Sequence, residues 1–204
     1  MFSATGLECV KGYDSLFSGL DLKIKQGEVM QIHGTNGSGK TSLLRILTGL
    51  SQPAAGEVFW NGVNIEDDPA AFNENLSYIG HLNGLKTELS ALENLHLMQK
   101  YLTRSSNTQP QAALDAVGLA GYEHILTYQL SAGQKRRVAL ARLALCNTPL
   151  WILDEPTTAI DNEGVQAFEQ TVIEHTNKGG MVILTAHQKL NFGATNLCSV
   201  NLSA

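Results

Sequence analysis

Short blocks of apolar and polar residues alternate along the chain and predict strands separated by helices. Between residues 20 and 24 apolar residues occupy every second position, which predicts a half-buried strand. Residues 29–33 predict a more deeply buried strand. The wholly apolar blocks 150–153 and 181–184 predict strands that are covered on both faces, as in a parallel sheet.

Turn and cap residues add a hairpin and several helices. Asn61-Gly62 lies between two strand-like stretches within 57–65, an arrangement typical of a tight β-hairpin. A Gly-rich turn after residue 33 leads into a helical pattern at 43–47, which Gly49 ends.

Two capping boxes predict helix starts in the middle of the chain, Ser90–Glu93 and Ser131–Gln134. The first helix is expected to show one face, made by Leu92, Leu95, His96 and Tyr101. A polar break at 105–108 separates it from a second helix, which ends near Gly118. The second box opens a longer helix.

These elements predict an α/β protein with one domain over residues 1–204. Strands alternate with helices everywhere except in an all-helical stretch near 85–148, which we interpret as an insert. A further helix at about 162–176 joins the last two buried strands.

Composition is that of a folded protein, with 43% apolar and 16% charged residues. The formal net charge of −5 gives no basic surface for nucleic acid. No apolar run approaches the ~20 residues that cross a bilayer, and the first residues lack a secretory signal pattern, so we expect a cytosolic chain. Cys9, Cys146 and Cys198 are widely spaced and are expected to be free thiols.

Residues 34–41 match the phosphate-binding pattern G-x-x-x-x-G-K-[ST], between a predicted strand and a predicted helix. Glycines let backbone N–H groups approach a polyphosphate, and the helix adds its positive end. Lys40 is expected to place its charge on the β and γ phosphates, and the Thr41 hydroxyl to bind Mg²⁺. The expected nucleotide-binding residues are Gly34, Thr35, Asn36, Gly37, Ser38, Gly39, Lys40, Thr41 and Ser42.

Two acids follow the apolar block 150–153. The carboxyl ends of parallel strands are where α/β folds bind ligands. We therefore expect Asp154 to hold Mg²⁺ and Glu155 to act as the general base that polarises the attacking water. The alternative is a strand-ending turn before Pro156 with no catalytic role.

Leu130-Ser131-Ala132-Gly133-Gln134 resembles the LSGGQ signature of ABC ATPases, with alanine for the first glycine. The resemblance implies a P-loop NTPase fold of the ABC ATPase type, with a mainly parallel core sheet, an antiparallel β part and a helical insert. It also implies ATP and Mg²⁺ as ligands, and a homodimer in which Ser131, Gly133 and Gln134 meet the nucleotide of the partner. The alternative is an ordinary capped helix whose exposed face carries Lys135, Arg136, Arg137 and Arg142.

Two further segments resemble the same family. Thr158-Ala159-Ile160-Asp161 is similar to the turn that crosses the dimer interface, which places Asp161 near the nucleotide. His187 follows the last buried strand, where the family has its switch histidine on the γ phosphate. The resemblance runs from Leu7 to Leu202.

The chain departs from the family pattern at two positions. Where the family has a glutamine that senses Mg²⁺ and the membrane partner, this sequence has His81. His81 either takes over that contact or only packs its loop against the helical insert. Tyr13 is the ring nearest to the usual adenine-stacking position, and either stacks on adenine or packs in the fold. His33, His96, His124 and His175 are expected to be structural or surface residues.

Several stretches, among them Tyr78-Ile79-Gly80-His81 and Thr185-Ala186-His187-Gln188, resemble the haem-exporter ATP-binding subunits of bacterial cytochrome c maturation. This resemblance implies integral membrane partners, a peripheral location on the cytoplasmic face of the inner membrane, and no direct contact with haem. The alternatives are a transporter ATPase for another cargo and a soluble ABC ATPase acting on ribosomes or DNA. A single cassette without heptads favours transport, and the signature and the Asp-Glu pair exclude a P-loop kinase.

Overall fold

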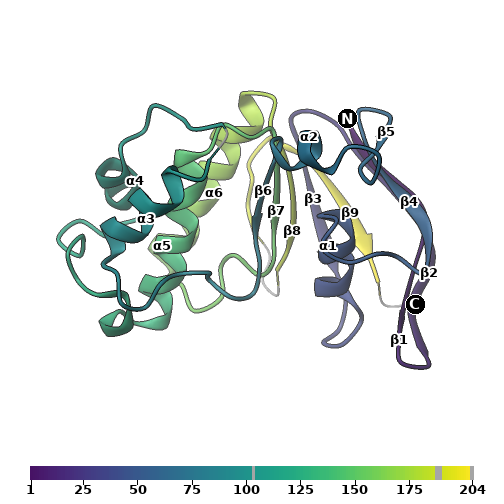
Figure 1. Cartoon of the computed structure of the whole chain (residues 1–204), viewed down its shortest axis with the longest axis horizontal. Helices are drawn as coiled ribbons and strands as arrows, with labels where there is room; N and C mark the ends of the chain where they lie inside the picture. Colours follow the sequence, from purple (N-terminus) through teal and green to yellow (C-terminus); the bar gives the residue numbers. More distant parts are fainter. Residues whose placement is uncertain (103, 187–189, 203–204) are drawn as a thin grey trace.

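The computed structural model describes residues 1–102, 104–186 and 190–202, and contains two sheets with helices around them (Figure 1). The larger sheet has five parallel strands in the order β6-β7-β8-β3-β9. These strands are β3 (Glu28–His33), β6 (Leu76–Ile79), β7 (Leu150–Leu153), β8 (Met181–Thr185) and β9 (Asn196–Asn201). The second sheet is antiparallel, in the order β2-β1-β4-β5. Its strands are β1 (Phe2–Lys11), β2 (Asp14–Ile24), β4 (Ala55–Trp60) and β5 (Val63–Asn64).

The central strands of the parallel sheet form because their residues are apolar on both faces. Every residue of β7 and β8 is buried, and the two strands pair in register from Leu150↔Met181 to Leu153↔Leu184. The strand β8 lies between β7 and β3. The carboxyl ends of these three strands therefore reach the same edge of the sheet.

Helices cover the parallel sheet and build a separate group at one end of the molecule (Figure 1). They are α1 (Lys40–Leu47), α2 (Pro69–Asn73), α3 (Ala91–Gln99), α4 (Pro110–Ala116), the 3-10 helix η1 (Thr127–Gln129), α5 (Ala132–Leu145) and α6 (Asn162–Asn177). Both predicted capping boxes are confirmed, since Ser90 and Ser131 accept from the N–H of Glu93 and Gln134, whose side chains accept from the N–H groups of the serines.

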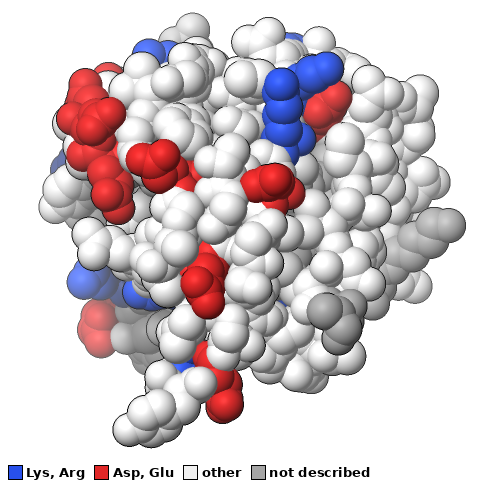
Figure 2. All heavy atoms as spheres, turned by 90° about the vertical axis from the view of Figure 1, so that its right-hand side faces the viewer, with Lys and Arg blue, Asp and Glu red and all other residues white. Residues whose placement is uncertain are grey.

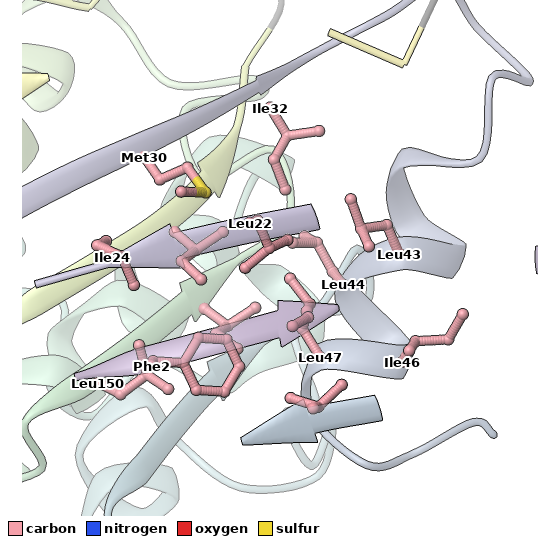
Figure 3. Packing of buried hydrophobic residues seen from close by; sticks show 14 of the residues in the cluster. Phe2, Leu22, Ile24, Met30, Ile32, Leu43, Leu44, Ile46, Leu47 and Leu150 are labelled. Carbon is pink, nitrogen blue, oxygen red and sulfur yellow. The ribbon is translucent and has the colours of Figure 1, made fainter. Parts of the chain in front are cut away.

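The main core lies where α1 packs between the two sheets. Figure 3 shows Leu43, Leu44 and Leu47 of α1 among side chains from both sheets, including Phe2 and Ile32. All five side chains are fully buried. This packing holds the first turn of α1 at the end of β3, which is the position that the phosphate-binding pattern requires.

The helix α5 belongs to two cores at once. Val138, Ala141 and Leu145 pack against α3 and α4, whereas Ala139 and Leu143 pack against the parallel sheet and α6. Because apolar residues lie on several sides of this helix, it packs between the helical group and the sheet.

The hairpin at Asn61-Gly62 is confirmed, with Trp60 paired to Val63 and both turn residues at positive φ, 51° and 86°.

The predicted face of the first helix is wrong in part, because His96 is exposed and Tyr101 is 80% exposed. Asn94 takes the buried position instead, since its amide group bonds to backbone carbonyls and to the Thr127 hydroxyl at 2.9 Å. The strands β1 and β9 and the helix α2 were not predicted.

Surface charge agrees with the acidic composition. On the face beyond the antiparallel sheet, Figure 2 shows scattered acidic side chains and few basic ones. Among the helices that the structure describes, none is both long and apolar enough to span a bilayer. Cys9, Cys146 and Cys198 are free and partly buried.

Candidate functional site

The loop between β3 and α1 has the backbone shape of a phosphate cradle. Gly37 and Gly39 have φ of 87° and 95°, a region that side chains rarely adopt. A Cβ on Gly39 would also lie 3.2 Å from the Cβ of Leu16 and 3.3 Å from the ring of Phe17. Both observations explain why glycine occupies this position.

Lys40 is the first residue of α1 and is only 8% exposed. Its ammonium group donates to the carbonyl oxygens of Gly34 at 2.8 Å and Thr35 at 3.0 Å. Among the described residues the only ion pair is Arg137–Asp161, so Lys40 has no carboxylate partner there. A cation at a helix N-terminus, surrounded by backbone groups, suits a bound anion.

The two acids lie at the end of β7, next to this loop. Asp154 is 1% exposed, and its Oδ2 accepts from the Thr41 hydroxyl at 2.8 Å. Its Oδ1 accepts from the Thr185 hydroxyl at 2.8 Å. Glu155 has a positive φ of 48°, and the Thr158 hydroxyl donates to its Oε2 at 3.3 Å. The structure thus brings the phosphate loop and the acids into direct contact, although they are far apart in the sequence.

One open cleft of about 430 Å³ joins these groups, which is within the usual range for ligand sites. Its lining includes Lys40, Thr41 and Glu155, together with His81. The other lining residues are Lys11, Leu16, Asn36, Gly37, Gly39 and Ser42. His81 is exposed and faces this cleft, so the alternative that it only packs its loop is not supported.

Tyr13 lies at the tip of the β1–β2 hairpin and is fully exposed. The alternative that Tyr13 packs in the fold is therefore wrong. Tyr13 is also not among the residues that line the cleft, whereas Lys11 and Leu16 from the same hairpin are. Adenine stacking by Tyr13 stays a prediction.

The signature residues line a second cleft of about 300 Å³, which shares no lining residue with the first. Ser131 is exposed and caps α5, and Gly133, Gln134 and Asp161 lie beside it. A Cβ on Gly133 would lie 2.4 Å from the carbonyl oxygen of Ala159, so only glycine fits there. The preceding Ala132 is exposed, which explains why alanine can replace the first glycine of the signature.

Asp161 caps α6 and forms an ion pair with Arg137. Its carboxylate accepts from the Gly164 N–H at 2.9 Å. This bond, together with Arg137, lowers the pKa of Asp161. Asp161 lines the second cleft and not the first. His187, the predicted switch histidine, lies outside the described residues.

Arg136 is 4% exposed, which contradicts the alternative that α5 carries its basic residues on an exposed face. Its guanidinium donates to the carbonyl oxygens of Gly80, Asp154 and Pro156 and to the side chain of Asn83. Burial lowers the pKa of Arg136, and the nearby carboxylates of Asp154 and Glu155 act in the opposite direction. One side chain thus connects the signature helix, the loop that contains His81 and the segment that bears the acids.

Sequence reasoning missed three kinds of residue at the site. Lys11 and Leu16 line the cleft but match no motif. Arg136 is given no role by sequence reasoning beyond the alternative of an exposed helix face. Thr185 appears in the sequence analysis only as part of a stretch that resembles the family, although its hydroxyl contacts Asp154 and the backbone of Glu155. A polar residue ending an apolar strand next to the acid-bearing strand is the signal that points to it.

This fold and these two clefts define an ATP-binding cassette, and comparisons with known proteins agree. The ABC transporter family matches residues 17–158, so the chain belongs to that family. The expectation of an ABC-type ATPase with a P-loop fold that binds ATP is confirmed.

The chain is 50% identical over 203 residues to the cytochrome c biogenesis ATP-binding export protein CcmA of Escherichia coli strain K12, covering 100% of this chain and 97% of that protein. Two solved dimers are also similar. A cassette in a post-hydrolysis state with ADP and Pi is 27% identical, with a TM-score of 0.77 and coverage of 92% of this chain and 88% of the other. A bacterial ABC transporter cassette is 25% identical, with a TM-score of 0.80 and coverage of 99% and 95%.

Proposed function

We propose that this chain is the ATP-hydrolysing subunit of a membrane complex for haem export or haem delivery in cytochrome c biogenesis. It works as a homodimer bound to integral membrane subunits at the cytoplasmic face of the inner membrane, without contacting haem or nucleic acid. The 50% identity to CcmA over the whole chain supports this assignment. The observation that carries the catalytic part is the direct hydrogen bond between Thr41 of the phosphate loop and Asp154.

In this proposal ATP enters the cleft with its phosphates against the backbone of residues 34–42. Lys40, which has only backbone carbonyls as described hydrogen-bond partners, turns its ammonium group to the β and γ phosphates. The N-terminus of α1 adds its positive dipole end. Binding thus exchanges bonds from the ammonium group to neutral carbonyl oxygens for bonds to charged phosphate oxygens, in which both partners are ionised.

Mg²⁺ fits the donor set of this cleft. The Thr41 hydroxyl and the Asp154 carboxylate are hard oxygen donors in contact with each other, and phosphates and water complete such sites. His81, on the cleft wall, is the third residue we assign to the metal or to its water. The metal would neutralise charge that develops on the phosphates.

Hydrolysis follows from the position of Glu155, which lines the same cleft as Lys40. Its carboxylate accepts a proton from a water molecule as the water oxygen bonds to the γ phosphorus. The bond from that phosphorus to the β–γ bridging oxygen breaks, which yields ADP and Pi. We assign to His187 a contact with the γ phosphate, as the switch histidine of the family makes.

The separation of the two clefts supports a shared active site. Ser131, Gly133 and Gln134 line a cleft without a phosphate loop, so within one chain they do not meet the nucleotide. In a dimer they contact the γ phosphate in the partner's first cleft, and Asp161 lies at the interface. The start of α5 then presents a second helix N-terminus to the same anion.

Two substitutions test the catalytic part. Glu155→Gln keeps the shape of the side chain but removes the base, so turnover should fall by ~10²–10⁴-fold with ATP affinity retained. Lys40→Ala should weaken ATP binding itself, because the ammonium group contacts phosphate in the ground state. Wild-type hydrolysis by Glu155→Gln, or unchanged affinity and activity of Lys40→Ala, would contradict the assignment.

The membrane part is tested by purification of the tagged chain from detergent-solubilised membranes. Integral membrane subunits should copurify, and deletion of their genes should release the chain from the membrane fraction. Copurification of ribosomes or DNA instead would support the soluble alternative. Membrane partners without a role in haem handling would indicate another cargo.

A further inference from the structure

Both acids at the end of β7 hydrogen-bond to one hydroxyl group, that of Thr185. The Thr185 Oγ1 donates to Asp154 Oδ1 at 2.8 Å and accepts from the Glu155 N–H at 2.8 Å. A hydroxyl has one hydrogen to donate and lone pairs to accept, so it makes both bonds at once. Thr185 is completely buried, and water therefore does not compete for either bond.

The topology explains why Thr185 occupies this place. It ends β8, the strand between β7, which carries the acids, and β3, which leads into the phosphate loop. Thr41 binds the other oxygen of Asp154 at 2.8 Å. Hydroxyl groups thus hold both carboxylate oxygens, and the carboxylate cannot rotate without losing a bond.

The bond to the Glu155 N–H has a second effect. Glu155 has φ of 48°, a conformation that is unfavourable for a residue with a side chain. Strained backbone of this kind persists only where surrounding contacts hold it. The direction of the Glu155 side chain depends on this backbone conformation, so Thr185 also orients the proposed base.

Strand packing alone does not require a hydroxyl at this position. The residues before Thr185 in β8 are Val182, Ile183 and Leu184, all completely buried and apolar. Valine has the same shape as threonine and would continue this pattern. The hydroxyl is therefore explained by its bonds to the acids rather than by the core.

We propose that Thr185 is a positioning residue for ATP hydrolysis, which orients Asp154 and Glu155 through one hydroxyl group. The inference rests on the proposed function, since it takes Asp154 as metal ligand and Glu155 as base. Thr185 itself does not line the nucleotide cleft. Its loss should therefore affect turnover and the use of Mg²⁺ rather than the binding of ATP.

The test compares Thr185→Val, which removes only the hydroxyl, with Thr185→Ser, which retains it. Thr185→Val should lower kcat at least ~10-fold, because small displacements of catalytic groups have effects of up to about 10²-fold. The affinity for a fluorescent ATP analogue in EDTA should stay within about threefold of wild type, while the Mg²⁺ concentration for half-maximal activity rises. Thr185→Ser should recover most of the kcat. Thr176→Val is the matched control, because the hydroxyl of buried Thr176 bonds, among the described residues, only to carbonyls within α6, and its loss should leave kcat unchanged.

The outcomes separate this inference from the proposed function. If Glu155→Gln is inactive but Thr185→Val has wild-type kcat and Mg²⁺ dependence, the positioning role is wrong and the proposed function stands. If Thr185→Ser is as impaired as Thr185→Val, the methyl packing matters and the inference is also wrong. Should Thr185→Val not fold, Thr185→Ala carries the same expectations. If Glu155→Gln is fully active, the proposed function itself fails.

Discussion

Replacement of Arg136 by methionine should destabilise the protein strongly, although the residue belongs to a run of basic residues. Methionine keeps the length and the apolar stem of the side chain and removes the guanidinium. The carbonyl oxygens of Asp154 and Pro156 then lose donors inside the protein, and those of Gly80 and Asn83 lose donors at its partly buried edge. Buried acceptors without donors are unfavourable.

The size of the effect follows from these bonds. Two of the four bonds are fully buried and involve a charged donor. Hydrogen bonds to charged groups contribute roughly 1.5–3 kcal/mol each, so the two together contribute about 3–6 kcal/mol. We expect a loss of about 3–5 kcal/mol, since some water can reach the carbonyl oxygens that lose their donor. That is a large fraction of the roughly 5–15 kcal/mol by which a domain is stable.

Urea unfolding at pH 7 measures this free energy, with Arg137→Met as the matched control. Arg137 is the next residue on the same helix, but its ion-pair partner Asp161 is exposed, so its replacement should have less than about half of the effect. An equal loss for the two variants, or a loss under about 1 kcal/mol for Arg136→Met, would refute the reasoning.

Three further predictions concern other parts of the molecule. Burial lowers the pKa of His175, which stacks on Trp151, to about 4. Below pH 6.5 the unfolded chain therefore binds a proton at this histidine that the folded protein does not bind. The contribution of His175 to the free energy of unfolding is thus fully present above pH 6.5 and is lost as the pH falls toward 4. Urea unfolding should show about 2 kcal/mol less stability at pH 5 than at pH 7 from this group, and His175→Phe should lack this difference; equal pH profiles would contradict it. Ser131→Arg should keep ATP binding but prevent productive dimers, and mixing it with Lys40→Ala subunits should restore some ATPase activity through one intact composite site; normal hydrolysis by Ser131→Arg homodimers would exclude shared sites. His81→Ala should impair partner-stimulated ATPase activity more than ATP binding, and His81→Gln should be tolerated; wild-type basal and stimulated rates for His81→Ala would remove the coupling role.

Features encoded in short stretches of sequence could be predicted. Residues 34–41 form a loop with the backbone shape of a phosphate cradle, because glycines, lysine and a helix start lie close together in the sequence. The apolar blocks of β7 and β8 are buried strands as their composition predicts. The hairpin at Asn61-Gly62 and the caps at Ser90 and Ser131 also depend only on local geometry.

Features that depend on contacts between distant segments could not be predicted. The run Lys135–Arg137 looks like the exposed face of a helix, but α5 is packed on several sides, and Arg136 therefore enters the core. Tyr101 continues an apolar face in sequence, but α3 ends at Gln99, before that face reaches it. The order of β7, β8 and β3 is a property of the whole sheet, so no local pattern places Thr185 beside Asp154.

Two of the missed residues at the site, Arg136 and Thr185, have one property in common, which explains why motif reasoning does not find them. Lys40 and Glu155 are assigned to the nucleotide, and the chemistry of phosphate or water limits which side chains can serve. Arg136 and Thr185 instead bind main-chain groups of the segment 154–156, which carries Glu155. Every residue type has a backbone N–H or carbonyl, so such contacts leave no pattern in the sequence of the bound segment. A folded structure is therefore needed to identify the residues that hold catalytic groups in place, even where the catalytic groups themselves are evident from a few letters.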